Sequence, residues 1–333
     1  MKGQVKEQMK AMVQDLYGSA DVLRLAEVDR PTCGDEDVLV KVKAAAVNAG
    51  DWHLMRGDPF LFRPMFGGYL RPKVKTLGFD VAGRVEAVGK RVTQFRPGDE
   101  VFGDISECGF GAFAEYVCVP VEALALKPAT VSFEAAAAVP AAAVTALQGL
   151  RDWGQLQPQQ SVLVNGASGG VGTFAVQIAN LLGAKVTAVC SASKMDRVRS
   201  LNPDNIIDYT QTDPTQTGHL YDLILDAAAY RSVFDYFPAL TPEGTYVLVG
   251  GSMRHLLQAM LVSLWFKEPQ RRKVKCFIAK PNPDDLKVVG DLLADGKIVP
   301  VVDRVYSLSQ VPEAIRQLEQ RQVRGKVVIR LAE

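Results

Sequence analysis

The chain has 333 residues, of which 48% are hydrophobic and 23% charged. This length favours about two domains, and this composition is typical of a protein that buries a core. The net charge is +1, from 38 basic and 37 acidic residues, which excludes a general electrostatic attraction to nucleic acid.

The first part of the chain is typical of a β-rich domain. After a polar lead, Met1 to Gln8, apolar and charged residues alternate over Asp37–Lys43, as in a half-buried strand. A second strand is expected over Val81–Val88. Arg96–Asp99 is expected to form a turn that leads into a strand at Glu100–Gly103.

The pattern changes near residue 132. Ser132–Leu150 is rich in alanine and predicts a helix with a kink at Pro140. A short buried strand, Ser161–Val164, then precedes a glycine-rich turn and a helix over Thr173–Leu182.

Strands and helices continue to alternate, which predicts a parallel, doubly wound sheet. Further strands are expected at Lys185–Cys190, Leu223–Leu225, Tyr246–Val249, Val299–Val305 and Gly325–Leu331, and further helices at Asp284–Asp295 and Val311–Glu319. We expect one domain over residues 132–280. The other is expected to be discontinuous, over residues 1–131 and 281–333.

The five cysteines are Cys33, Cys108, Cys118, Cys190 and Cys276. Their odd number and the lack of a C-x-x-C pair argue against a disulfide framework and against a structural zinc site. Free thiols, together with an N-terminal segment that lacks an apolar signal core, predict a reducing compartment and a cytoplasmic protein. No apolar run reaches the roughly 18 residues of a membrane-spanning helix.

The strongest motif is the glycine-rich turn between the expected strand and helix. Glycines at 166, 169 and 172 allow a tight turn and a close approach of the backbone to a pyrophosphate, whereas glycines alone would also suit an ordinary loop. The order strand, turn, helix favours a dinucleotide site. Its expected cofactor contacts are Gly166, Ser168, Gly169, Gly170, Val171 and Gly172.

The residues that distinguish NAD from NADP are expected at the end of the next strand. An NAD-binding protein usually has an acidic residue there. This chain has Cys190 followed by Ser191, Ser193 and Lys194. Two hydroxyls and an ammonium suit a 2′-phosphate, which predicts NADP as the cofactor. The alternative is a polar loop that only caps the next helix.

Several motifs together resemble the medium-chain dehydrogenase/reductase superfamily. They are Ala46-Val47-Asn48 before Asp51, residues 77–83 (LGFDVAG), 97–99 (PGD), 164–172 and 325–329 (GKVVI), and the resemblance runs from about Met9 to Leu331. It implies an α/β protein with a GroES-like β domain and a Rossmann domain. In that family the active site lies in the cleft between the two domains.

The resemblance also indicates a branch without zinc. The positions that hold catalytic zinc in the family's alcohol dehydrogenases fall here at Gly50, Phe79 and Ala141. The stretch that matches their structural-zinc lobe, residues 104–114, is short and contains one cysteine, Cys108. The chain is therefore similar to the quinone oxidoreductases and enone reductases.

The resemblance implies active-site roles for Asn48 and Asp51. The family's common tyrosine falls at His53, which is either a donor in the site or an ordinary surface-edge histidine. Further cofactor contacts implied by the family are Thr145, Tyr209, Gly250, Phe277 and Ile278.

These features predict an NADPH-dependent oxidoreductase that transfers hydride to a quinone or an α,β-unsaturated carbonyl without zinc. Two alternatives remain open: an NADP-dependent alcohol or aldehyde oxidoreductase of the same fold, and a non-catalytic NADPH-binding sensor. A short-chain dehydrogenase is disfavoured. Its Tyr-x-x-x-Lys pattern occurs at Tyr69–Lys73, but Pro72 interrupts it and it precedes the glycine motif.

The family resemblance suggests a homodimer and a small-molecule quinone or enone as the partner. Apolar residues 259–266 precede a basic cluster in residues 267–275. This segment could lie weakly on an anionic membrane surface, but a helix at the substrate cleft or at an interface is favoured.

Overall fold

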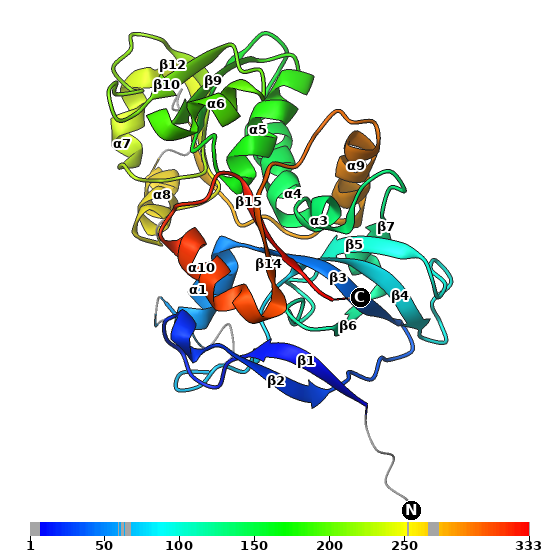
Figure 1. Ribbon diagram of the computed structural model, residues 1–333. Coiled ribbons are helices and arrows are strands. Elements are labelled where there is room, and N and C mark those ends of the chain that lie inside the picture. The colour runs from blue at the N-terminus through cyan, green and yellow to red at the C-terminus, as the bar shows by residue number, and fades with distance from the viewer. Residues whose placement is uncertain are drawn as a thin grey trace, which may run out of the picture. The chain divides into compact units, whose positions relative to one another are not determined.

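The computed structural model describes residues 7–58, 60, 63, 68–251, 253–265 and 273–332. The chain forms two compact units (Figure 1). The first unit comprises Met1–Ala141, Pro281–Ala294 and Val302–Glu333, and the second comprises Ala142–Lys280 and Asp295–Val301. The sequence had placed the first boundary at residue 132, whereas the units divide within helix α4.

The first unit is built on a mixed, seven-stranded sheet in the order β14-β15-β3-β4-β5-β7, with β6 paired to β3, beside a separate antiparallel pair, β1-β2. The strands are β1 (Gln8–Val13), β2 (Arg24–Asp29), β3 (Asp37–Val47), β4 (Asp80–Val88), β5 (Glu100–Asp104), β6 (Tyr116–Pro120), β7 (Leu124–Leu126), β14 (Val302–Ser307) and β15 (Lys326–Arg330). The helices are α1 (Ala49–Arg56), α3 (Phe133–Ala137), α9 (Pro283–Ala294) and α10 (Val311–Glu319).

Strand β3 is central to this sheet because it pairs with three other strands. Its alternating Val38, Val40 and Val42 are buried in the core of the unit, as the sequence pattern predicted. Strand β15 pairs with β3 in antiparallel fashion, so the end of the chain completes the sheet that its first part begins (Figure 1).

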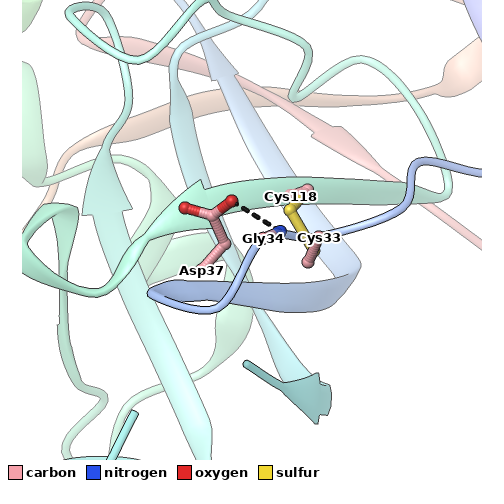
Figure 2. Close-up of a disulfide and its surroundings, with 4 residues drawn as sticks. All are labelled: Cys33, Gly34, Asp37 and Cys118. Atoms are coloured by element: carbon pink, nitrogen blue, oxygen red, sulfur yellow. Dashed lines mark hydrogen bonds between the residues drawn. A yellow bond between two sulfur atoms is a disulfide. The ribbon is translucent and has the colours of Figure 1, made fainter. Parts of the chain in front are cut away.

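A disulfide joins Cys33 to Cys118, so the expectation of free thiols is wrong for these two cysteines. Cys33 precedes β3 and Cys118 lies in β6, and the antiparallel pairing of these strands brings the two Cα atoms to 5.6 Å. Spacing along the chain could not reveal a contact that strand pairing creates across 85 residues. Beside the disulfide, the Gly34 amide donates to Oδ2 of Asp37 at 2.9 Å (Figure 2).

The second unit contains the expected parallel, doubly wound sheet, with six strands in the order β10-β9-β8-β11-β12-β13. Its strands are β8 (Ser161–Asn165), β9 (Lys185–Cys190), β10 (Asn205–Asp208), β11 (Tyr221–Asp226), β12 (Leu240–Leu248) and β13 (Lys273–Cys276). Its helices are α4 (Pro140–Gln148), which begins in the first unit, α5 (Gly170–Leu181), α6 (Met195–Arg199), α7 (Val233–Tyr236) and α8 (Met253–Trp265). One face of the sheet packs into a core that contains Leu163, Ile224 and Tyr246.

The helical segments differ from the sequence prediction at two places. Instead of kinking one helix, Pro140 begins α4, and α3 ends before it at Ala137, because proline fits the first turn of a helix. Helix α5 begins at Gly170, inside the glycine turn rather than after it.

Among the described residues, no helix is both long enough and apolar enough to cross a membrane. The apolar segment 259–266 falls mostly in α8. Residues 266–272, which hold most of the basic cluster, lie outside the described part of the chain.

Candidate active site

The glycine-rich turn lies between β8 and α5 in the second unit. Gly166 has a φ of +80°, which favours glycine, and its carbonyl oxygen accepts from the Gly169 amide at 3.0 Å. A Cβ atom on Gly172 would lie 2.1 Å from that same carbonyl oxygen, so a side chain does not fit there. Ser168, Gly170 and Val171 complete the turn. This cradle fits a dinucleotide pyrophosphate, because the first turn of α5 presents amides without intrahelical partners at the positive end of the helix dipole.

Other predicted cofactor contacts follow the carboxyl ends of the same parallel sheet. The strand ends are aligned, since Cys190 lies opposite Asp208 and Leu248 lies opposite Cys276. Ligands of such sheets bind beyond these ends. The residues that follow them are Gly166 after β8, Ser191 after β9, Tyr209 after β10, Gly250 after β12 and Phe277 after β13.

The segment after β9 gathers the residues expected to read the 2′-phosphate. The hydroxyl oxygens of Ser191 and Ser193 lie 3.4 Å apart, and Lys194 closes a single 3-10 turn that follows Ser191. The amide of Tyr209 donates to the Cys190 carbonyl oxygen at 3.1 Å, so Tyr209 lies beside this loop. The structure therefore brings these four predicted residues to one corner of the sheet.

Asp208, which the sequence reasoning did not single out, holds this loop in place. Its Oδ1 accepts from the Ala192 amide at 3.1 Å and from the Thr210 hydroxyl at 2.7 Å. The hydrogen bond from Thr210 contributes most to lowering the pKa of Asp208 below its usual value. Asp208 ends the strand that follows β9 in the chain, and its place opposite Cys190 brings it to the same corner of the sheet.

The four remaining residues expected to contact the cofactor are in different settings. Thr145 is half-buried on α4, and Gly250 is exposed after β12. Phe277 is buried and stacks on Trp153, with ring centroids 5.1 Å apart and planes 9° apart. Ile278 is 79% exposed, so Phe277 supports the sheet end while Ile278 is the more accessible of the pair.

In the first unit, polar residues form a row across one edge of the mixed sheet. Strand pairing sets Val327 opposite Val47, which places Lys326 opposite Asn48. The next strands set Ala46 opposite Asp80 and Asp80 opposite Asp104. The row therefore runs Lys326, Asn48, Asp80, Asp104, with one residue from each of four adjacent strands or from the segment directly after a strand.

A hydrogen-bonded ion pair connects three members of this row. Nζ of Lys326 donates to Oδ1 of Asn48 at 2.5 Å and to Oδ2 of Asp80 at 2.9 Å. Nδ2 of Asn48 donates to the same Asp80 oxygen at 2.9 Å. The side chains of Lys326 and Asp80 are 3% and 0% exposed. Because buried charges need a partner, this pair is stable only as a unit.

Asp51 and Asp104 flank the ion pair, and the pKa values of both carboxyl groups are raised. Asp51 accepts from the amides of Asn48 and Gly78 at 2.8 Å and 2.9 Å, which ties the start of α1 to the segment before Phe79. Burial is the main cause that raises the pKa of Asp51 to about 7. Burial and then the charge of Asp80 raise the pKa of Asp104 to about 7.

His53 lies on α1 and is held as a neutral imidazole. Its ring stacks on Trp52 at a centroid distance of 3.6 Å, and its Nδ1 lies 3.2 Å from the carbonyl oxygen of Asp58. A carbonyl oxygen can only accept, so Nδ1 carries the proton and Nε2 has a lone pair. Burial lowers the pKa of His53, which favours this neutral form at pH 7.

The positions that match the family's zinc ligands do not fit a metal ion. A Cβ on Gly50 would lie 3.0 Å from a ring carbon of Phe79, and neither residue nor Ala141 has a side-chain donor atom. Sequence reasoning found these positions, together with Asn48, Asp51 and His53. It missed Asp80, Asp104 and Lys326, because only the register of the paired strands brings them beside Asn48.

Comparison with known proteins gives the chain a family. The family described as "Alcohol dehydrogenase GroES-like domain" matches residues 34–129, and "Zinc-binding dehydrogenase" matches residues 201–329. The chain is 34% identical to the 2-methylene-furan-3-one reductase of Solanum lycopersicum, over 98% of this chain and 80% of that protein. It is 33% identical to the chloroplastic NADPH-dependent alkenal/one oxidoreductase of Arabidopsis thaliana, with the same coverage.

A solved structure agrees with these relatives. The quinone oxidoreductase from Coxiella burnetii superposes with a TM-score of 0.87 at 26% identity, over 98% of this chain and 100% of that one. The expected GroES-like and Rossmann folds are thereby confirmed. The chain belongs to the medium-chain dehydrogenase/reductase superfamily, in its quinone oxidoreductase-like branch.

Proposed function

We propose that this protein is a zinc-independent, NADPH-dependent reductase of quinones or α,β-unsaturated carbonyls. The observation that carries the proposal is the side-chain-free cradle at Gly166 and Gly172, followed by a loop of hydroxyls and an ammonium in place of a carboxylate. The names of the tomato and Arabidopsis relatives, a furanone reductase and an NADPH-dependent alkenal/one oxidoreductase, support the same chemistry.

The second unit would hold the cofactor. The amides of residues 170–172 would bind the pyrophosphate beside the Gly166–Gly169 turn, and Ser191, Ser193 and Lys194 would bind the 2′-phosphate, with Tyr209 beside them. Thr145, Gly250, Phe277 and Ile278 would contact the nicotinamide half. When bound, NADPH supplies a hydride.

The first unit would orient the substrate and manage the proton. Nε2 of neutral His53 can accept a hydrogen bond from a substrate hydroxyl, or take a proton from solvent and deliver it. Asp51 would act through Asn48, since its buried carboxylate accepts a hydrogen bond from the backbone amide of Asn48. A quinone or enone carbon is already electrophilic, so the protein needs to orient the reactants rather than polarise an alcohol with a metal.

Zinc independence rests on the donor set. Gly50, Phe79 and Ala141 offer no oxygen, nitrogen or sulfur side-chain atom, and no step of the proposed reaction uses a metal. Purified protein should contain far less than one zinc per chain, and chelators should leave its activity unchanged. About one zinc per chain, with activity lost to chelation, would overturn this part of the proposal.

The test of function is a screen of quinones, enones, alkenals, aldehydes and alcohols with NADPH and NADH in parallel. We expect turnover of quinones or enones, and a preference for NADPH of roughly tenfold or more, the value of one charge-assisted hydrogen bond. Turnover of alcohols or aldehydes alone would favour the alcohol oxidoreductase. NADPH binding without turnover of any of them would favour the sensor.

A double substitution tests the preference for NADPH. The double substitution Cys190→Asp with Ser191→Ala places a carboxylate where NAD-binding proteins have one and removes a hydroxyl. It should shrink or reverse the preference for NADPH. An unchanged ratio would mean that these residues do not read the 2′-phosphate.

We further propose a homodimer and a cytoplasmic location, although the Arabidopsis relative is named as chloroplastic. Since one pair of cysteines is joined in a disulfide, a reducing compartment is supported by the three thiols of Cys108, Cys190 and Cys276 alone. Light scattering of the purified protein tests the first proposal, since a monomer mass would refute it. Cell fractionation tests the second.

A further inference from the structure

We propose that Lys326 is a positioning residue, which fixes the Asn48 amide so that its oxygen accepts a hydrogen bond from a hydroxyl of the bound reactants. The identity of those reactants rests on the proposed function. The orientation of the Asn48 side-chain amide is independent of that function, because it depends only on contacts within the first unit.

The hydrogen bonds of Asn48 determine what it can offer. Its two Nδ2 hydrogens are used by Oδ2 of Asp80 at 2.9 Å and by the carbonyl oxygen of Ala46 at 3.2 Å. Its Oδ1 accepts from Nζ of Lys326 at 2.5 Å. A carboxamide has two donor hydrogens and one acceptor oxygen, so this amide has its donors committed and keeps only its oxygen for a ligand.

Lys326 gives the amide its orientation. If the amide turned by 180°, an NH₂ group would face the Lys326 ammonium and the oxygen would face the Asp80 carboxylate, and both contacts would be repulsive. Lys326 and Asp80 are buried, so water does not screen this preference. Asn48 is only half-buried, which leaves part of it accessible.

The fixed orientation selects the chemistry of the partner. An amide oxygen binds an O–H or N–H group and repels a carbonyl oxygen. Of these donors, the one we propose is a hydroxyl, which can belong either to a ribose of the dinucleotide or to the reduced form of the substrate. The two sources separate in measurement: the first would change NADPH affinity, and the second would change kcat/KM for the substrate at saturating NADPH.

The experiment compares Asn48→Ala, Lys326→Met and their double variant by kcat/KM and by the Kd for NADPH. Lys127→Met is the matched control, since Lys127 is equally buried in the same unit and pairs with Glu100 at 2.9 Å, away from the row. We expect each single variant to lose about fivefold or more in one of the two constants, and the double variant to lose no more than the worse single. Lys127→Met should keep both constants.

Two further variants keep the test decisive if Lys326→Met does not fold. Lys326→Arg keeps the charge and should recover most of the loss. Lys326→Met with Asp80→Asn removes both buried charges together, so the fold is retained while the orientation of Asn48 is lost. The proposal would be overturned if the losses of Asn48→Ala and Lys326→Met in kcat/KM or in NADPH affinity added up in their double variant. An equal loss in Lys127→Met would also overturn it.

A readout without turnover separates this proposal from the proposed function. In NMR spectra of the free protein, the Asn48 side-chain NH₂ pair is the one that disappears in Asn48→Ala. Its hydrogen exchange should be slow in the wild type and in Lys127→Met, and at least about tenfold faster in Lys326→Met, which keeps the Asp80 acceptor of this NH₂ group. Slow exchange in a protein without reductase activity would refute the proposed function and leave the positioning intact. Exchange that does not respond to Lys326 would refute the positioning.

Discussion

The backbone amide of Ala192 donates a hydrogen bond to Oδ1 of Asp208 at 3.1 Å. This contact joins the loop after β9 to the end of β10, so the hydroxyls and the ammonium proposed to bind a 2′-phosphate are fixed by a carboxylate on the neighbouring strand. An acid next to the loop thus has a structural function.

We predict that Asp208→Ala raises the KM for NADPH by about three- to tenfold with little change in kcat, because the loop loses its anchor while the hydride-transfer site is untouched. Steady-state kinetics with NADPH as the varied substrate check this. Asp204→Ala is the control, since Asp204 accepts from the Val186 amide at 2.7 Å near the start of the same strand β9, far from its carboxyl end. Equal effects of the two substitutions would contradict the prediction.

A second prediction concerns the glycine turn. Gly172→Ala should lower the affinity for NADPH by at least about tenfold, because its Cβ would displace the Gly166 carbonyl that shapes the turn. Isothermal titration calorimetry measures this. Gly290→Ala on α9 adds the same methyl group where the nearest atom, on the ring of Phe102, is 3.3 Å away, and it should bind NADPH as the wild type does. Unchanged affinity in Gly172→Ala would disprove the role of the turn.

A third prediction is a pH dependence of stability. The pKa of Asp104 is raised to about 7 in the folded protein, so folding takes up a proton between roughly pH 4 and pH 7 and stability falls as the pH rises through this range. Asp104→Asn stays neutral and can keep the hydrogen bond from the Ser106 amide.

The free energy of unfolding of Asp104→Asn, relative to the wild type, should therefore increase with pH by up to about 1.4 kcal/mol per unit, and level off above about pH 7. Urea unfolding at several pH values between 5 and 8 measures this difference. A difference that does not change between pH 5 and pH 7 would show that Asp104 titrates normally.

A fourth prediction concerns the disulfide. Under denaturing conditions without reductant, thiol titration should give three free thiols, from Cys108, Cys190 and Cys276, and five after reduction. Reduction should also destabilise the protein by roughly 2–5 kcal/mol, because the bond closes a long loop. Cys33→Ser with Cys118→Ser should give three thiols in both conditions and a stability that does not respond to reductant. Five thiols before reduction would exclude the bond.

The sequence alone was sufficient to predict those elements whose structure depends on a local residue pattern. Strand β9 and helix α10 have the predicted limits, because alternation or helical periodicity is strong there and turn residues bound both. The glycine turn was identified for the same reason, since strand, turn and helix follow one another directly in the chain.

Features that depend on strand pairing were not predicted. Cys33 and Cys118 meet because β3 and β6 pair, and Lys326 reaches Asn48 because β15 pairs with β3. Neither pairing leaves a trace in local composition. Lys326 is also the first residue of its strand, before three apolar residues, where a lysine would ordinarily be expected to reach solvent.

The pairing of β15 with β3 has a consequence for the order in which the chain can fold during synthesis. The second unit is nearly continuous, from Ala142 to Lys280, so most of it leaves the ribosome before the first unit has its last strands. Until Lys326 emerges, Asp80 lacks its cation and β3 has an open edge. We therefore expect the glycine cradle to form first and the row around Asn48 to form only after the last strand is made. A chain that stops before β15 would have a nucleotide-binding half without a completed substrate half.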